Sequence, residues 1–235
     1  MTPDVVATAA GFLTPEGYGS SAFGRRPWLD GSGQPCARPE LMDIAWSSLF
    51  AAPCPRFGRM SPLARAGLMA VELLDPGFAA LTDAQRTDTG VCMVSPSGPV
   101  ETDLEFLRTL SPAAFTYTLS AAVLGEVCIR HRLRGPGLCL MSGGSGGRGV
   151  VEEAAERIAL GEAAFMVCLA CEAVGPEARA LVNYALDKHS PFCWYAYGLF
   201  LARKDAAPGP GRALPAGGGP GGVKLRDLCL DLCGG

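Results

Sequence analysis

The sequence contains no uninterrupted apolar run as long as the ~20 residues that a membrane-spanning helix needs, although 49% of its residues are hydrophobic. Charged residues, glycine or proline break each run, so we expect the apolar residues in a buried sheet or an interface. The N-terminus, MTPDVVATAAGF, also lacks the basic segment and long apolar core of a secretory signal. We therefore expect a cytoplasmic chain without a membrane span, whose cysteines are reduced.

An excess of charge of one sign is also absent. The formal net charge is −3, and the acidic and basic residues are scattered along the chain. A nucleic-acid-binding protein needs a basic stripe that neutralises phosphates. Nucleic acid is therefore not an expected partner.

Histidine is scarce, since the chain contains only His131 and His189. His131 lies just before a predicted turn, and His189 follows a predicted helix. We expect both side chains at the surface or at helix ends, without a catalytic role.

The ten cysteines include two pairs with the spacing of a metal site. Cys168 and Cys171 fall in a predicted strand, where alternation sends them to opposite faces of a sheet. Cys229 and Cys233 would meet on one face of a terminal helix, as a metal-binding or redox-active pair, but no histidine lies nearby. We expect buried cysteines, no metal and no cofactor.

Segments with strand and helix patterns alternate along the chain, whose 235 residues are enough for a core without disulfides or metals. Strands are expected at residues 4–12, 89–95, 136–142, 163–172 and 192–204. Helices are expected at residues 61–75, 102–110, 111–133, 150–160 and 176–189, with a short helix at 41–50 among the loops of 19–56. The helix at 111–133 is expected to be buried on most sides. This alternation predicts an α/β fold with a mostly parallel sheet.

A composition change marks the end of the expected domain. Residues 205–222 are almost wholly alanine, glycine and proline, which pack no core and are typical of a flexible tail. We predict one domain over residues 1–204 and a tail over 205–235. Within the tail, residues 224–233 have the pattern of a small helix that docks back or onto a partner.

A glycine cluster at residues 142–149 lies between a predicted strand and a predicted helix. Gly144, Gly146 and Gly149 match G-x-G-x-x-G, and Glu172 ends the next strand roughly 20 residues later, as a dinucleotide-binding site requires. Glycines there let a pyrophosphate approach the backbone, and the helix N-terminus stabilises it. One alternative is therefore a dinucleotide-binding protein.

The same cluster contains G-x-S-x-G at Gly143, Ser145 and Gly147, which is the nucleophile elbow of serine hydrolases. Asp187 and His189 follow in the order that a catalytic triad needs. Both end a predicted helix, however, instead of lying in loops after separate strands. A serine hydrolase that uses Ser145 is a second alternative.

The stretch from Ser111 to Glu172 also matches one enzyme family. In that family a helix beginning with Ser-Pro leads to a Leu-Arg-Gly-Pro turn, a strand, a tight elbow, and a helix that ends in Gly-Glu before another apolar strand. The matching residues, in register without a gap, are Ser111, Pro112, Thr118, Gly125, Leu133, Arg134, Gly135, Pro136, Ala154, Gly161 and Glu162. In these features the chain resembles the β-ketoacyl synthases. Weaker resemblance extends from VVATAAGFLTPEGYG to YGLFLAR, so it covers nearly all of the chain before the tail, but only one half of a full synthase.

The resemblance implies the N-terminal half of a thiolase-like layered α/β fold, with a mixed, mostly parallel sheet flanked by helices. The family condenses acyl chains through a cysteine at the N-terminus of the elbow helix, where the helix dipole and backbone N–H groups favour the thiolate. In this register that position is Gly144, which has no side chain to acylate. The family's two catalytic histidines come from the second half. We therefore expect no condensing activity from this chain alone.

The resemblance also implies a partner. The complete fold packs two similar halves together, so one half leaves apolar surface that seeks a cover. Family members dimerise through their elbow-side strands, and an inactive copy can pair with an active synthase as a chain-length factor. We therefore predict a non-catalytic subunit of an acyl-chain condensing enzyme in fatty-acid or polyketide-type biosynthesis, paired with a catalytic β-ketoacyl synthase and possibly served by an acyl carrier protein. The glycine at position 144 has a second explanation, in which the chain is a degenerate relic or one half of a split gene.

In that role the helix over residues 112–127 lies at the interface and shapes the end of the partner's acyl tunnel. The candidates for the tunnel wall are Phe115, Tyr117, Leu119 and Val123. Each is equally compatible with an ordinary place in the core.

Overall fold

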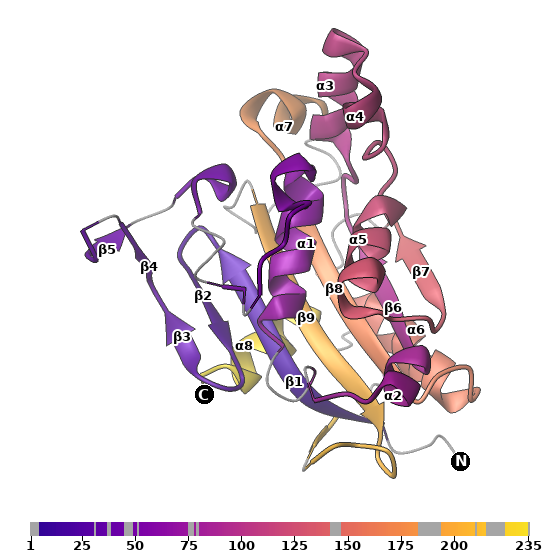
Figure 1. The fold of residues 1–235 in the computed structure, drawn as a ribbon. Helices are drawn as coiled ribbons and strands as arrows, with labels where there is room; N and C mark the ends of the chain where they lie inside the picture. Colours follow the sequence, from indigo (N-terminus) through magenta and orange to yellow (C-terminus); the bar gives the residue numbers. More distant parts are fainter. Residues whose placement is uncertain are drawn as a thin grey trace.

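The structure is a computed structural model that describes residues 5–30, 32–36, 39–44, 49–50, 52–74, 78, 80–141, 147–182, 194–209, 211–214 and 224–234. A large β-sheet crosses it, with helices on both faces (Figure 1). Its strands are β1 (Val5–Thr14), β2 (Gly17–Ser20), β3 (Gly24–Arg26), β6 (Thr89–Val94), β7 (Gly137–Leu140), β8 (Phe165–Ala173), β9 (Trp194–Arg203) and β10 (Arg212–Ala213). They lie in the order β3-β2-β1-β9-β8-β6-β7, with β10 on β1. A separate small sheet consists of β4 (Trp28–Leu29) and β5 (Pro35–Cys36).

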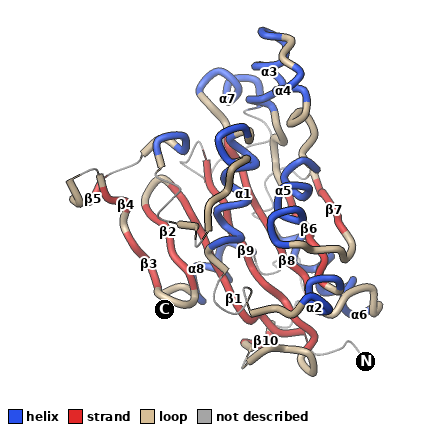
Figure 2. Tube along the Cα trace, viewed as in Figure 1, coloured by secondary structure: helices blue, strands red, loops and turns tan. Residues whose placement is uncertain are grey.

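The helices flank the sheet and also lie near both of its ends (Figure 2). They are α1 (Pro62–Glu72), α2 (Asp83–Thr87), α3 (Val100–Thr109), α4 (Pro112–Phe115), α5 (Ala121–His131), α6 (Arg148–Ala159), α7 (Pro176–Val182) and α8 (Leu225–Leu232), with 3-10 turns η1 (Leu41–Asp43) and η3 (Phe57–Arg59). In Figure 1, α3, α4 and α7 lie together beyond the end of the sheet. None of the helices in the described residues is long and apolar enough to cross a membrane.

The sheet contains strands of both directions, and β2 and β10 pair antiparallel with β1. β9 pairs antiparallel with β1 and with β8, whereas β6 pairs in parallel with both β8 and β7. β1, β6, β7 and β8 therefore share a direction, and the predicted mixed α/β sheet is confirmed. The pairing departs from the expected parallel majority at β9, which is antiparallel to both of its neighbours.

Each face of the sheet carries its own hydrophobic core, because side chains alternate along a strand. Phe200 belongs to the core under α1 and α5, and its neighbour Leu199 to the core under α6 and α8. Cys171 and Cys168 are divided between these cores in the same way, so they lie on opposite faces as predicted.

Helix α1 begins where the sequence predicted. The Ser61 hydroxyl accepts a hydrogen bond from the Ala64 amide at 3.3 Å, and Pro62 occupies the first helical position. Gly67 then lets α1 approach α5 closely, since a Cβ there would lie 2.5 Å from Val123 Cγ1. The two helices pack as one layer on the sheet.

The helix expected over residues 111–133 is instead two helices, α4 and α5. The hydroxyls of Thr116 and Thr118 donate to the carbonyls of Pro112 and Phe115, at 3.1 and 2.9 Å. These local bonds satisfy acceptors that the next helical turn would use. The expectation of burial also fails for the first half, where Phe115 is 60% exposed.

The segment over residues 19–56 contains more structure than the expected loops. β2 and β3 form a hairpin on β1, and Trp28 Nε1 donates to the Thr14 carbonyl at 2.8 Å. Of the helix expected at 41–50, only η1 is present in the described residues, and 45–48 lie outside them.

After the Ala/Gly/Pro-rich segment the chain returns to the sheet. α8 packs across β1 and β9 with Leu225, Cys229 and Cys233 buried. The Cys229 thiol donates to the Gly198 carbonyl at 3.1 Å, and the Cys233 thiol to the Ala10 carbonyl at 3.6 Å. Burial raises the pKa of both thiols, which disfavours the metal-binding or redox pair that their spacing allowed. Packed structure therefore continues past the expected boundary at residue 204.

Candidate functional site

The candidate site lies where the parallel strands β6, β7 and β8 end together. Residues 142–146 of the glycine cluster, which include Gly143, Gly144, Ser145 and Gly146, lie outside the described residues. The chain resumes at Gly147, just before α6.

Gly147 is required by its surroundings. Its φ is 79°, which side chains disfavour, and a Cβ there would lie 2.9 Å from Cβ of both Ala170 and Leu225. The close packing of α6 against β8 and α8 is thus a sufficient reason for glycine at position 147, and a nucleophile elbow is not needed to explain it. Asp187 and His189, the other members of the proposed triad, lie outside the described residues.

Gly149 and Glu172 do not support a dinucleotide site. A Cβ at Gly149 would have no neighbour within 4 Å, so no close approach of backbone depends on it. Glu172 is fully buried, and its carboxylate accepts hydrogen bonds from the Ser97 amide at 3.0 Å, the Ser97 hydroxyl and the Ala173 amide at 3.3 Å. An enclosed carboxylate with these partners does not face a ribose.

Glu172 instead anchors the turn between β6 and α3. Burial raises the pKa of this carboxyl to about 7, although the bonds from Ser97 act in the opposite direction. The adjoining Ser95 hydroxyl accepts from the Gly98 amide at 3.0 Å. Sequence reasoning did not identify Ser97, and the available signal was a carboxylate inside an apolar strand, which needs a polar partner.

The structure separates the four tunnel-wall candidates. Phe115 and Leu119 are 60% and 70% exposed, whereas Tyr117 and Val123 are 7% and 2% exposed. Val123 faces α1 in the core, and Phe115 packs on Phe106 of α3 with ring centroids 5.2 Å apart. Two candidates therefore reach the surface, and two belong to the core.

A buried carboxylate fixes the connection between α4 and α5. Glu126 Oε1 accepts from the Tyr117 hydroxyl and from Arg56 Nη2, both at 2.7 Å. Burial and the Glu126 carboxylate raise the pKa of Tyr117, so its hydroxyl remains a donor. Tyr117 thus positions the segment that carries Phe115 and Leu119.

β7 leaves one edge of the sheet open, because no strand of the described residues pairs with its outer side. Met141, directly after β7, is exposed, and so is Ile129 on the neighbouring helix α5. The Ser120 hydroxyl lies 3.4 Å from Met141 Sδ, which places the start of α5 over the end of β7. Cys139 of β7 packs against the core under α5, and burial raises the pKa of its thiol. The raised pKa disfavours the thiolate that a nucleophile needs.

His131 ends α5, as the sequence predicted, but its side chain is only 12% exposed. Its Nε2 lies 3.4 Å from Glu72 Oε1, an oxygen that already accepts from Arg130 Nε at 2.8 Å. Burial lowers the pKa of His131 to about 3, and the charges of Arg130 and Arg86 act in the same direction. The imidazole is therefore neutral at physiological pH. His189 lies outside the described residues.

This histidine should make the fold sensitive to acid. The pKa of His131 is lower in the folded state than in the unfolded state. Below pH 6.5 the unfolded chain therefore binds a proton that folded His131 does not bind. The free energy of unfolding thus falls as pH drops from 6.5 towards 3. Between pH 7 and 4 we expect the natural protein to lose about 3 kcal/mol more than His131→Gln. Urea unfolding at several pH values measures both curves. Parallel curves would contradict a buried neutral histidine.

Comparisons with known proteins were made by sequence and by structure. No family model and no curated protein matches the sequence. Among solved structures, the ishigamide ketosynthase/chain length factor aligns with a TM-score of 0.67 at 16% identity, over 88% of this chain and 64% of that chain. The chain has the ketosynthase fold.

Two further ketosynthase structures agree. One is a type II polyketide synthase acyl-carrier protein in complex with its ketosynthase bound to the hexaketide, with a TM-score of 0.62, 18% identity and coverage of 87% of this chain and 64% of that one. The other is the ketosynthase ApeO in complex with its chain length factor ApeC from Xenorhabdus doucetiae, with a TM-score of 0.56, 17% identity and coverage of 85% and 79%. The chain thus spans somewhat less than two thirds of the first two ketosynthase chains. The predicted thiolase-like class is confirmed at the level of the fold.

Proposed function

We propose that this chain is a non-catalytic, chain-length-factor-type subunit that pairs with a catalytic β-ketoacyl synthase in fatty-acid or polyketide-type biosynthesis. What supports the proposal is the ketosynthase fold, together with the sequence register in which Gly144 takes the place of the family's nucleophilic cysteine. The solved structures with this fold include pairs of a ketosynthase with a chain length factor, and a ketosynthase with an acyl-carrier protein. We accordingly expect an acyl carrier protein as a further partner, and a cytoplasmic location.

The proposed interface is the open edge of β7 with the apolar side chains beside it. An unpaired edge offers a row of backbone donors and acceptors to a strand of another chain. Leu119, Ile129 and Met141 are 70%, 60% and 59% exposed, and burying them would add an apolar contribution. Leu119 lies next to Ser120, whose hydroxyl is 3.4 Å from Met141 Sδ, so Leu119 and Met141 come close together at the end of β7.

The proposed contact with the acyl tunnel is made by Phe115 and Leu119. Both side chains are exposed, and they lie on or just after α4, at the end of the molecule that extends beyond the sheet in Figure 1. Tyr117, bound to Glu126, and Val123, packed on α1, hold this segment from the inside. A partner's growing chain would then meet Phe115 and Leu119 directly.

Co-expression with an intact ketosynthase tests the proposal. We expect a stable heterodimer in size-exclusion chromatography, which Ile129→Arg breaks because it buries a charge in the interface. In a condensation assay, Phe115→Ala should shift the products towards longer chains, because the wall recedes.

Leu160→Ala is the matched control. Leu160 is 62% exposed directly after α6 and is not among the residues proposed for the interface or the tunnel contact, so neither assembly nor product length should change. The subunit role would be refuted if the chain stays monomeric and does not bind the synthase, or if Leu160→Ala produces the same product shift.

A further inference from the structure

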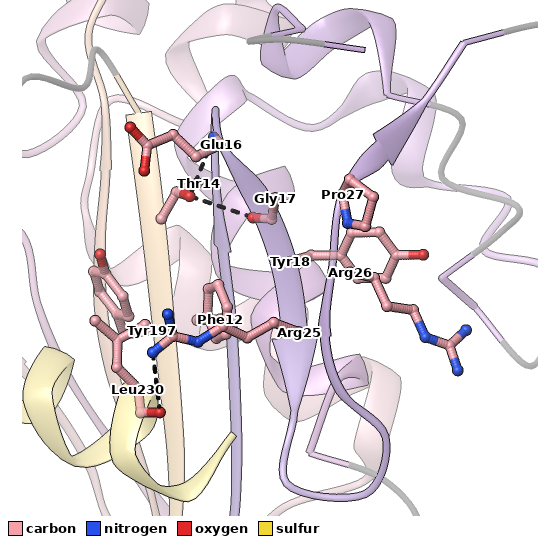
Figure 3. A pocket seen from close by; sticks show the side chains of 10 residues that line it. All are labelled: Phe12, Thr14, Glu16, Gly17, Tyr18, Arg25, Arg26, Pro27, Tyr197 and Leu230. Carbon is pink, nitrogen blue, oxygen red and sulfur yellow. Dashed lines mark hydrogen bonds between the residues drawn. The ribbon is translucent and has the colours of Figure 1, made fainter. Parts of the chain in front are cut away.

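A pocket of about 340 Å³ opens at the end of α8 that lies away from Gly147 (Figure 3). The turn between β1 and β2, strand β3, strand β9 and the last turn of α8 enclose it. The ten residues that line it are Phe12, Thr14, Glu16, Gly17, Tyr18, Arg25, Arg26, Pro27, Tyr197 and Leu230. This volume is within the range of small-molecule sites.

Aromatic rings form the apolar part of the pocket. Phe12 and Tyr197, on the adjacent strands β1 and β9, are stacked with centroids 6.5 Å apart and an interplanar angle of 26°. Each residue is only 5% exposed, so the rings are held firmly by the core beneath them. Tyr18 is fixed in turn by Trp28, at 4.6 Å between centroids. Rigid, nearly parallel rings favour a planar ligand.

The hydroxyl of Tyr197 is the unusual feature of this pocket. It has no hydrogen-bond partner among the described residues, although the side chain is more than nine-tenths buried. Burial raises the pKa of Tyr197, so the hydroxyl keeps its proton and can donate. In Figure 3 it points along β9 towards the end of the pocket where Glu16 lies. The hydroxyl reaches the pocket, so it is available as a donor to a ligand there.

Arg25 brings a positive charge to the other side of the pocket. Its guanidinium lies 6.0 Å from the centroid of the Phe12 ring, and Nη2 donates to the Leu230 carbonyl at 3.4 Å. Figure 3 shows it extending across the pocket towards Tyr197 and α8. A planar guanidinium with donors to spare matches a carboxylate in a bidentate way. Arg26 also lines the pocket, but its guanidinium is held 4.2 Å from the ring of Phe23.

We propose that this pocket binds a small monocarboxylate with a planar, apolar body. The carboxylate pairs with Arg25, the body lies against Phe12 and Tyr197, and a polar group on the body accepts from the Tyr197 hydroxyl. The site is separate from the β7 interface, and it stands whether or not the chain serves a ketosynthase.

Titration of the full chain with para-hydroxybenzoate, followed by calorimetry or by NMR, tests the site. Arg25→Gln should weaken binding tenfold or more, and Tyr197→Phe about threefold to tenfold, because the first removes a charged hydrogen bond and the second a neutral one. Arg212→Gln and Tyr195→Phe are the matched controls, since neither residue lines the pocket, and each should change affinity less than twofold. Unchanged thermal melting of the variants shows that they fold.

Three outcomes would overturn the proposal. They are absence of saturable binding at millimolar probe, equal binding of the uncharged para-hydroxybenzamide, and equal affinity for inorganic phosphate. The last would mean a simple anion site at Arg25 that makes no use of the rings.

Discussion

Replacing Gly135 with alanine is expected to lower the free energy of unfolding by about 3 kcal/mol. A Cβ at this position would lie 2.6 Å from the carbonyl carbon of Thr89 and 2.7 Å from the amide of Gly90. These are backbone atoms of β6, which is paired on one side with β7 and on the other with β8, so they cannot yield. The Gly135 amide also donates to the Thr89 carbonyl at 3.0 Å, and the substitution would displace this turn and β7 behind it.

Gly125→Ala is the matched control for this prediction. Gly125 lies in α5, and a Cβ there would have no neighbour within 4 Å. Alanine is the better helix former, so this change should stabilise the chain by up to about 1 kcal/mol. Urea unfolding of both variants gives the comparison. If Gly135→Ala unfolds at the same urea concentration as the natural protein, this turn does not approach β6 as closely as described.

The second large effect is a dependence of stability on pH through Glu172. Its folded pKa of about 7 is above the ordinary glutamate value of 4.5, so the folded state binds the proton more tightly. The stabilisation is fully present below pH 4.5 and is lost as pH rises through 7, to a total of about 3 kcal/mol. Glu172→Gln keeps the neutral form at every pH. The variant should therefore gain stability relative to the natural protein between pH 5 and 8.

Glu177→Gln serves as the control for Glu172. The Glu177 side chain is 64% exposed and forms only a surface pair with Arg108 at 3.4 Å. Such pairs contribute little, so the difference from the natural protein should stay nearly constant over this range. Unfolding midpoints at pH 5, 6, 7 and 8 decide the matter. A Glu172→Gln difference that does not grow with pH would show that the carboxyl is not shielded from water.

The elements that sequence analysis predicted well are those with a strong local signal. β8 is a continuous apolar run, and α1 has a serine cap, a first-turn proline and an apolar face. The β2 and β3 hairpin was missed because its strands are four and three residues long and depend on pairing with β1. The antiparallel course of β9 was missed because the alternation of strand and helix patterns does not give the direction of each strand in the sheet.

The candidate site was predicted less completely, for a physical reason. The glycine at position 144 follows from the register of a motif, which is local information. The partners of Glu172 and Glu126 come from segments about 70 residues away, as the bonds from Ser97 and Arg56 show. The pocket brings together Phe12 and Leu230, which are too far apart in the chain for any sequence motif to relate them.

The central place of β9 has a consequence for synthesis of the chain. β1 comprises residues 5–14, and it gains its main neighbour only when residues 194–203 have been made. At 5–20 residues per second, β1 waits roughly 10–40 s for that partner while the chain emerges from the ribosome. During this interval one edge of β1 is open and the β8 edge is also unpaired, which makes the nascent chain prone to association with other chains. Contacts of such sequence separation also slow folding, so this protein should depend on chaperones more than its size suggests.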